Sequence, residues 1–122
     1  MKMIQAGRLT HWYRLYKLYC EAFPSYERKP FSLIRSMQKK GKSDIWYFEK
    51  DGKFAGLVFT INSDDIILID YLAIASDRRG EGIGSEIMVQ LQEFYQEKGI
   101  FVEIESVFDK CDNLKERLRR KE

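Results

Sequence analysis

The chain has 122 residues, 44% of them hydrophobic and 14% aromatic, which suits one packed globular domain and leaves no room for a second. Its 21 basic and 19 acidic side chains give a formal net charge of +2, which does not support bulk nucleic-acid binding. No apolar run is long enough to span a membrane, and the N-terminus lacks the apolar core of a signal peptide. Two cysteines, Cys20 and Cys111, and one histidine do not predict a disulfide framework or a metal site. These features favour a reduced, cytoplasmic protein.

Hydrophobic periodicity and turn residues predict an alternation of helices and strands. In chain order these are helices over Leu9–Phe23 and Phe31–Lys40, strands over Ile45–Lys50, Phe54–Ile61 and Ile66–Ala75, a helix over Gly82–Lys98, a strand over Ile100–Val107 and a charged helix over Asn113–Glu122. Asp51-Gly52 is a two-residue hairpin signal between two strands. The expected order is therefore ααβββαβα, an α/β (α+β) fold with a mixed sheet in residues 1–122. Its first strands are antiparallel, and its last strand–helix–strand unit is parallel.

The most informative segment is Ile66–Gly84, where a hydrophobic strand leads through the basic turn Asp77-Arg78-Arg79 into three glycines and a helix. Backbone N–H groups, the positive end of a helix dipole and two arginines meet there, which predicts a site for a phosphorylated ligand. A P-loop is excluded because no Gly-Lys-Ser/Thr follows Gly84. A dinucleotide-binding fingerprint fits poorly, because Ser85 stands at its third position and only one βαβ unit is expected. A third interpretation gives the glycines a role in turn formation and helix packing only.

At these residues the chain resembles the GNAT superfamily of acetyl-CoA-dependent N-acyltransferases. The family's Arg/Gln-x-x-Gly-x-Gly/Ala signature is matched at every fixed position by Arg79-Gly80-Glu81-Gly82-Ile83-Gly84. The strand ending in Leu72-Ala73-Ile74 and the helix that follows agree with it, as do Glu21-Ala22-Phe23-Pro24 and Glu27-Arg28-Lys29-Pro30 upstream. The resemblance implies a GNAT-like fold and transfer of an acetyl group from acetyl-CoA to a primary amine of a small molecule or peptide.

The resemblance also implies where acetyl-CoA would bind. The backbone of Leu72 and Ile74 would hydrogen-bond the pantetheine arm, which acts as an extra strand between the two parallel strands. Backbone amides from Arg79 to Ser85 would hold the pyrophosphate at the helix N-terminus. Positive charge would come from Arg78 and Arg79, one of them reaching a phosphate, although a solvated turn is the alternative. The full set implied for acetyl-CoA is Leu72, Ile74, Arg78, Arg79, Gly80, Gly82, Ile83, Gly84 and Ser85.

Asp70 is the candidate general base. Strand alternation places it on one face with Leu68, Leu72 and Ile74, so a carboxylate would lie among aliphatic side chains beside the reacting thioester. An equal alternative is that Asp70 orients a substrate amine or pairs with a nearby basic side chain. Acidic residues that could bind a cationic acceptor are Glu27, Glu103 and Glu105, which the sequence does not rank. His11 is expected to be structural.

The resemblance departs from the family at the C-terminal end. In the family, a tyrosine near the departing thiolate and two further strands follow the last helix, and both positions lie beyond Glu122. The general acid is therefore not assigned. Two functions stay open: a GNAT-like N-acetyltransferase, and a non-catalytic acyl-CoA-binding sensor or scaffold of the same fold. A sheet that stopped at Ile100–Val107 would leave an apolar edge, which predicts a homodimer through that strand or a longer natural protein.

Overall fold

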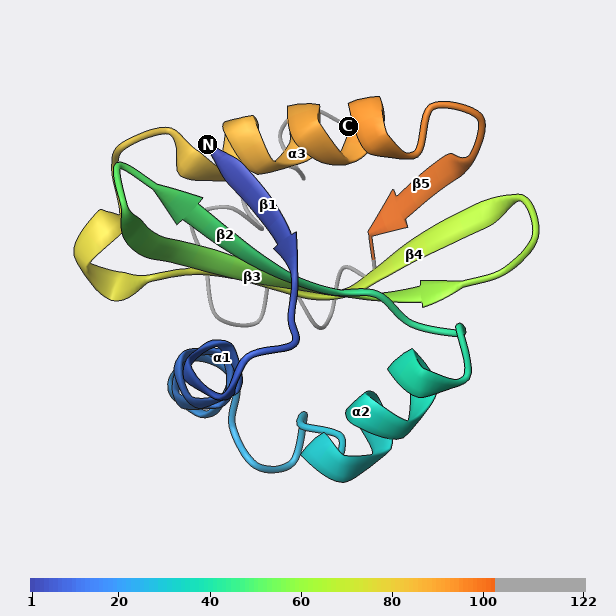
Figure 1. Cartoon of the computed structure of the whole chain (residues 1–122), viewed down its shortest axis with the longest axis horizontal. Helices are drawn as coiled ribbons and strands as arrows, with labels where there is room; N and C mark the ends of the chain where they lie inside the picture. Colours follow the sequence, from blue (N-terminus) through green and yellow to red (C-terminus); the bar gives the residue numbers. More distant parts are fainter. Residues whose placement is uncertain (103–122) are drawn as a thin grey trace.

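The computed structural model describes residues 1–102 as one five-stranded sheet with helices on both faces (Figure 1). Helices α1 and α2 cover one face, and helix α3 covers the other. The elements in chain order are β1 (Lys2–Gln5), α1 (Leu9–Ala22), α2 (Phe31–Lys39), β2 (Ile45–Lys50), β3 (Lys53–Asn62), β4 (Ile66–Ile74), the 3-10 turn η1 (Ser76–Arg78), α3 (Ile83–Phe94) and β5 (Gly99–Val102). This arrangement confirms the expected mixed α+β sheet.

The strands run in the predicted directions. Strands β1 to β4 are antiparallel neighbours in sequence order, and β4 pairs with β5 in parallel. Asp51 and Gly52 both have positive φ angles, of 55° and 75°, the backbone that a tight two-residue hairpin requires. The hairpin predicted from these two residues is therefore confirmed.

Strand β1 was not predicted, and the expected order ααβββαβα is wrong at its start. Lys2–Gln5 pairs antiparallel with β2, Lys2 opposite Glu49 and Gln5 opposite Trp46. Four residues are too few to show a clear alternation, so the pairing with β2 defines this strand more than its own sequence does. Helix α3 also ends earlier than expected: it stops at Phe94, and a turn follows in which the Lys98 N–H donates to the Tyr95 carbonyl at 2.9 Å.

The sheet separates two hydrophobic cores. The core under α1 and α2 is rich in aromatic side chains, among them Tyr19, Phe23, Phe59 and Tyr71. The core under α3 is mainly aliphatic, and Ile83, Ile87 and Leu91 form the buried stripe of that helix together with Tyr95. On α1 the buried face is formed by Leu15, Leu18, Tyr19 and Ala22, whereas Tyr16 is 52% exposed.

Two expectations fall outside residues 1–102: the second half of the last strand and the charged helix over Asn113–Glu122. The homodimer through the last strand therefore stays a prediction. Among the described helices, none is both long enough and apolar enough to cross a membrane.

Candidate functional site

Strand β4 contains a bulge at Asp70. Phe59 of β3 pairs with Tyr71, and the next residue, Thr60, pairs with Ile69, so Asp70 has no partner opposite it. An extra residue in one strand reverses the alternation of side chains beyond it. Ile67 and Ile69 before the bulge, and Leu72 and Ile74 after it, accordingly all pack in the core under α3. Tyr71 and Ala73 belong to the core under α1 and α2.

The expected face of Asp70 is thereby corrected. Its carboxylate does not share a face with Leu72 and Ile74, because the bulge moves those two residues to the α3 side. Asp70 lies on the other side of the sheet, in a small cavity of about 70 Å³ between β4 and α2. The cavity is lined by Lys29, Leu33, Ile34, Met37, Ser43, Phe59, Ile61 and Asp70.

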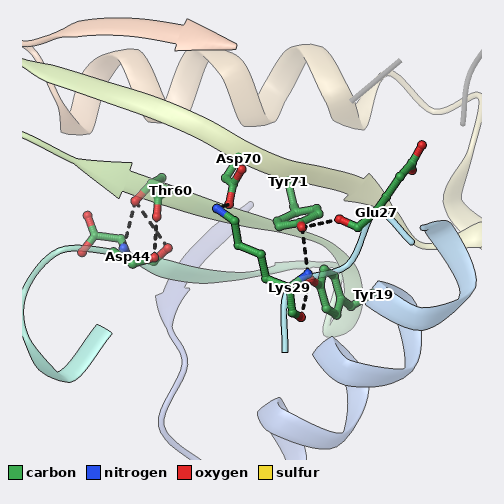
Figure 2. Close-up of polar contacts among 8 residues, drawn as sticks. Tyr19, Glu27, Lys29, Asp44, Thr60, Asp70 and Tyr71 are labelled. Carbon is green, nitrogen blue, oxygen red and sulfur yellow. Dashed lines mark hydrogen bonds and ion pairs between the residues drawn. The ribbon is translucent and has the colours of Figure 1, made fainter. Parts of the chain in front are cut away.

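The Asp70 carboxylate is paired with Lys29. The Lys29 Nζ atom lies 2.6 Å from Asp70 Oδ2, and the Asp70 side chain is only 7% exposed whereas that of Lys29 is 42% exposed. Figure 2 shows the lysine side chain reaching from the α1–α2 loop to the strand. Pairing with a basic side chain was one of the two interpretations of Asp70 left open by the sequence, and Lys29 supplies that cation.

Two tyrosine hydroxyls hold the α1–α2 loop against the sheet. The Tyr71 hydroxyl accepts a hydrogen bond from the Lys29 backbone N–H at 3.1 Å and donates one to the Glu27 carbonyl at 2.6 Å. The Tyr19 hydroxyl donates to the Lys29 carbonyl at 2.9 Å. Burial raises the pKa of Tyr19 above its usual value, so this donor keeps its proton through the neutral range. Both backbone groups of Lys29 are therefore fixed (Figure 2).

The other acidic candidates are not brought to Asp70. Glu27 lies in the α1–α2 loop, but its carboxylate points away from the Lys29–Asp70 pair (Figure 2). Glu103 and Glu105 lie outside the described residues. His11 has a structural role, as expected: its ring packs 4.5 Å from that of Tyr47, and its Nδ1 accepts the N–H of Arg8 at 3.4 Å at the start of α1.

The second half of β4 has an open edge within the described chain. Among residues 1–102, the partners of β5 in β4 are Ile66–Ile69. The Ala75 N–H donates to the Ala55 carbonyl of β3 at 2.9 Å, and alternate residues of a strand direct their polar groups to the same side. The backbone groups of Leu72 and Ile74 therefore point away from β3, toward the side where no described strand pairs with them. Such an edge can accept an extended chain as an additional strand.

The turn after β4 presents unpaired backbone amides. Gly80 and Gly82 have φ angles of +85° and +75°, which favour glycine, and Gly82 precedes the first residue of α3 without a side-chain cap. Glu86 is the first residue of the helix whose N–H finds a backbone acceptor, the Gly82 carbonyl at 3.2 Å. Within residues 1–102, the amides of Ile83, Gly84 and Ser85 have no acceptor, as is usual for a first helical turn. These amides and the helix dipole suit an anion.

The two arginines of the turn differ in their surroundings. The Arg78 side chain is only 8% exposed, and its guanidinium donates to the Lys50 carbonyl at 3.0 Å and to the Glu81 carboxylate at 3.2 Å. Arg79 is exposed. Arg78 therefore joins the turn to the end of β2, and Arg79 is the arginine whose charge is available to a ligand.

Sequence reasoning missed three residues of this region: Lys29, Tyr19 and Tyr71. Lys29 was noted only as part of Glu27-Arg28-Lys29-Pro30, and neither tyrosine was given a role. The contact of Lys29 with Tyr71 spans 42 residues, a separation that no local pattern signals. Within residues 1–102, no group of three or more His, Cys, Asp or Glu side chains is arranged to hold a metal ion.

Comparison with protein families matches residues 12–116 to the acetyltransferase (GNAT) family. The curated Bacillus subtilis (strain 168) protein named "Putative acetyltransferase YjbC" is 33% identical over 104 residues, which cover 85% of this chain and 52% of that protein. The chain thus spans about half the length of this curated relative.

Solved structures show the same fold. A GNAT-family protein from Bacteroides thetaiotaomicron superposes with a TM-score of 0.75 at 18% identity, over 84% of this chain and 59% of that one. A Clostridium acetobutylicum protein described as a predicted acetyltransferase with acetyl-CoA superposes with a TM-score of 0.58 at 10% identity, over 83% of this chain and 80% of that one. The family match covers most of the sequence and agrees with the Arg79–Gly84 signature; the chain belongs to the GNAT acetyltransferase family.

Proposed function

We propose that this chain transfers an acetyl group from acetyl-CoA to a primary amine. The observation that carries the proposal is that three features follow one another along the chain: the buried Asp70 carboxylate, the second half of β4, whose edge is open among residues 1–102, and the amides at the start of α3. Family membership supports acyl transfer in general. The order of the three features suggests how the two substrates would be placed.

The residues fit acetyl-CoA along these three features. The amides of Ile83, Gly84 and Ser85 suit a pyrophosphate, and the exposed Arg79 can add a charge-assisted hydrogen bond. The outward backbone groups of Leu72 and Ile74 suit the amides of the pantetheine arm, which would lie along β4 as an extra strand. From Ile74 back to Asp70 is four residue steps, or about 13 Å of strand. The thioester would then lie close to the bulge.

Asp70 supplies the base in this proposal. An acceptor amine arrives as an ammonium and must lose a proton before its nitrogen can attack the thioester carbonyl. The Asp70 carboxylate is buried at the bulge and paired with Lys29, so an acceptor amine that takes the place of the Lys29 ammonium would meet a proton acceptor there. The new C–N bond replaces the C–S bond, and coenzyme A leaves as a thiolate. The carboxylate also favours a cationic acceptor over a neutral one.

Two measurements on the whole chain test the proposal. Calorimetry with acetyl-CoA should show binding, and at about one hundred times the dissociation constant the folded state should gain about 2.7 kcal/mol. Thiol release should then be followed over a panel of amines: peptide N-termini, lysine peptides, polyamines and aminoglycosides. Binding without turnover of any amine would select the alternative, an acyl-CoA-binding domain without catalysis. Absence of binding would overturn the proposal.

A further inference from the structure

We propose that Lys29 is itself an acceptor: the chain acetylates the Nζ atom of Lys29 in an intramolecular reaction. The inference rests on the proposed function, because it uses the same acetyl-CoA site. Its starting observation is that a primary amine of the chain already lies 2.6 Å from the carboxylate proposed as the general base. An external acceptor amine would have to occupy this same position.

The amine is held there by the loop that carries it. Tyr71 binds the backbone N–H of Lys29 and Tyr19 binds its carbonyl, and the residue that follows is Pro30, whose ring fixes its φ angle. The root of the lysine side chain is thus tied to β4 and α1 and cannot drift away with the loop. A reacting group held in this way has a high effective concentration, which in general removes much of the entropic part of a barrier.

Lys29 is also accessible to the reagent. Its side chain is 42% exposed, whereas its partner Asp70 is 7% exposed, so the ammonium is at the mouth of the small cavity and the carboxylate is at its base. Asp70 lies two residues before Leu72, where the open edge of β4 begins to offer its backbone groups. The acetyl carbonyl of a coenzyme bound along that edge would therefore arrive next to this amine.

The reaction balances without a further reagent. The Lys29 ammonium gives one proton to Asp70, and the neutral nitrogen forms a C–N bond to the acetyl carbonyl carbon. The C–S bond breaks, and coenzyme A leaves as a thiolate. The nitrogen loses a second proton as the amide forms; one of the two protons can end on the thiolate, and the other passes from Asp70 to solvent. The product is a neutral N-acetyl-lysine, which no longer forms an ion pair with Asp70.

A second lysine–carboxylate pair provides an internal control. Lys50 Nζ lies 2.7 Å from Glu86 Oε1, a distance close to that of the Lys29–Asp70 pair, but Glu86 belongs to the first turn of α3. That pair lies at the start of α3, where the pyrophosphate would bind, away from the thioester. Lys2, whose side chain is 77% exposed and whose Nζ lies 4.0 Å from Glu49 Oε2, reports the spontaneous acetylation of an exposed amine.

The experiment incubates the full chain with acetyl-CoA and follows acetylation of each lysine by peptide mass spectrometry over time. Acetylation of Lys29 should be about 10²-fold faster than that of Lys2 or Lys50, and its first-order rate constant should not change with protein concentration. Asp70→Asn should reduce the rate at Lys29 alone. Lys29→Arg keeps a cation for Asp70 and removes the acceptor, so its protein should gain no fast acetyl group while its melting temperature stays near that of the parent.

Calorimetry with acetyl-CoA on the same samples separates this inference from the proposed function. If acetyl-CoA binds and Lys29 is acetylated no faster than Lys2, the self-acetylation is wrong and the proposed function stands. If the rate at Lys29 rises in proportion to protein concentration, the reaction is between molecules and the intramolecular proposal is wrong. If acetyl-CoA does not bind, both proposals fail.

Discussion

The two loops beside the second half of β4 differ in whether their backbone polar groups are hydrogen-bonded. In the α1–α2 loop, the polar groups of Glu27 and Lys29 are bound by the hydroxyls of Tyr19 and Tyr71. In the turn between β4 and α3, the amides that open the helix have no acceptor within the described residues. The protein's own side chains satisfy the backbone hydrogen bonds of the α1–α2 loop, whereas the amides of the turn are arranged so that a ligand can bind them.

This contrast separates structural residues from binding residues. Buried polar groups are almost always hydrogen-bonded in folded proteins, so a side chain that hydrogen-bonds a backbone group stabilises the fold. Amides left open beside a positive φ glycine and a helix dipole are suited to an incoming anion. We therefore expect changes in the α1–α2 loop to alter stability and acceptor chemistry, and changes in the turn to alter acetyl-CoA affinity.

The largest expected effect is at Asp70. Asp70→Asn should lower turnover about 10²- to 10⁴-fold, because an amide cannot accept the proton of the acceptor amine. Affinity for acetyl-CoA should stay near that of the parent chain, since the path along Leu72 and Ile74 is untouched. Steady-state kinetics beside calorimetry checks this, with the exposed Asp64 changed to Asn as a control carboxylate. Equal turnover in Asp70→Asn and the parent would show that Asp70 is not the general base.

Next comes the pair of arginines in the turn. Arg79→Met should weaken acetyl-CoA binding about 10- to 100-fold, because a hydrogen bond to a charged group contributes roughly 1.5–3 kcal/mol. Its melting temperature should hardly change, since Arg79 is exposed. Arg78→Met should instead lower the melting temperature, because the Lys50 carbonyl loses its buried donor. Calorimetry and thermal melts distinguish the two; the reverse pattern would exchange the roles of the two arginines.

A smaller effect is expected at Gly82. Gly82→Ala should reduce acetyl-CoA affinity about tenfold, because the new methyl group alters the amides that begin α3, each of them a hydrogen-bond donor to a charged group. It should also cost about 1 kcal/mol of folding free energy, because φ is +75° there. Gly41→Ala is the matched control: Gly41 has the same φ of +75°, and an added methyl meets nothing within 4 Å at either position. Equal affinity in the two variants would contradict a role for the turn.

Loss of the hydrogen bonds that hold the α1–α2 loop should lower the stability of the folded chain. Tyr71→Phe should lower the free energy of unfolding by about 1–2 kcal/mol, because the Lys29 N–H and the Glu27 carbonyl lose their shared partner. The ring packing against Tyr19 and Phe23 is kept in this variant. Urea denaturation measures the loss, with Tyr13→Phe on the exposed side of α1 as the control. If acetyl-CoA affinity fell as strongly as stability, the proposed division between a structural loop and a binding turn would be wrong.

The smallest effect is a dependence on alkaline pH. Burial raises the pKa of Tyr19 above its usual value near 10, so the folded chain holds this proton more tightly than the unfolded chain does. The resulting stability is fully present below about pH 10 and is lost as the pH rises above it, by roughly 0.4 kcal/mol at pH 10 itself. Tyr19→Phe should lessen this decline in urea titrations between about pH 8 and 11. Burial also raises the pKa of Tyr95, so Tyr95 should contribute a second part of the alkaline loss of stability, and the Tyr19→Phe variant should keep that part.

The sequence by itself determined the elements whose signals are local. The Asp51-Gly52 hairpin, the bounds of β2 and the start of α2 follow from neighbouring residues. The family resemblance follows from Arg79–Gly84 together with the strand before it and the helix after it, because this signature lies within six residues of a single turn. The buried stripe of α3 also follows from helical periodicity alone.

Only the tertiary structure decided the chemistry around Asp70. Regular alternation puts Asp70 with Leu72 and Ile74, but the bulge opposite Phe59 and Thr60 depends on how two strands pair, and it reverses the faces beyond it. The cation beside Asp70 comes from 41 residues away, and which of two adjacent arginines is buried depends on where the end of β2 lies. Local patterns fix the backbone because they act through neighbours in sequence. The partners of a side chain are fixed by neighbours in space.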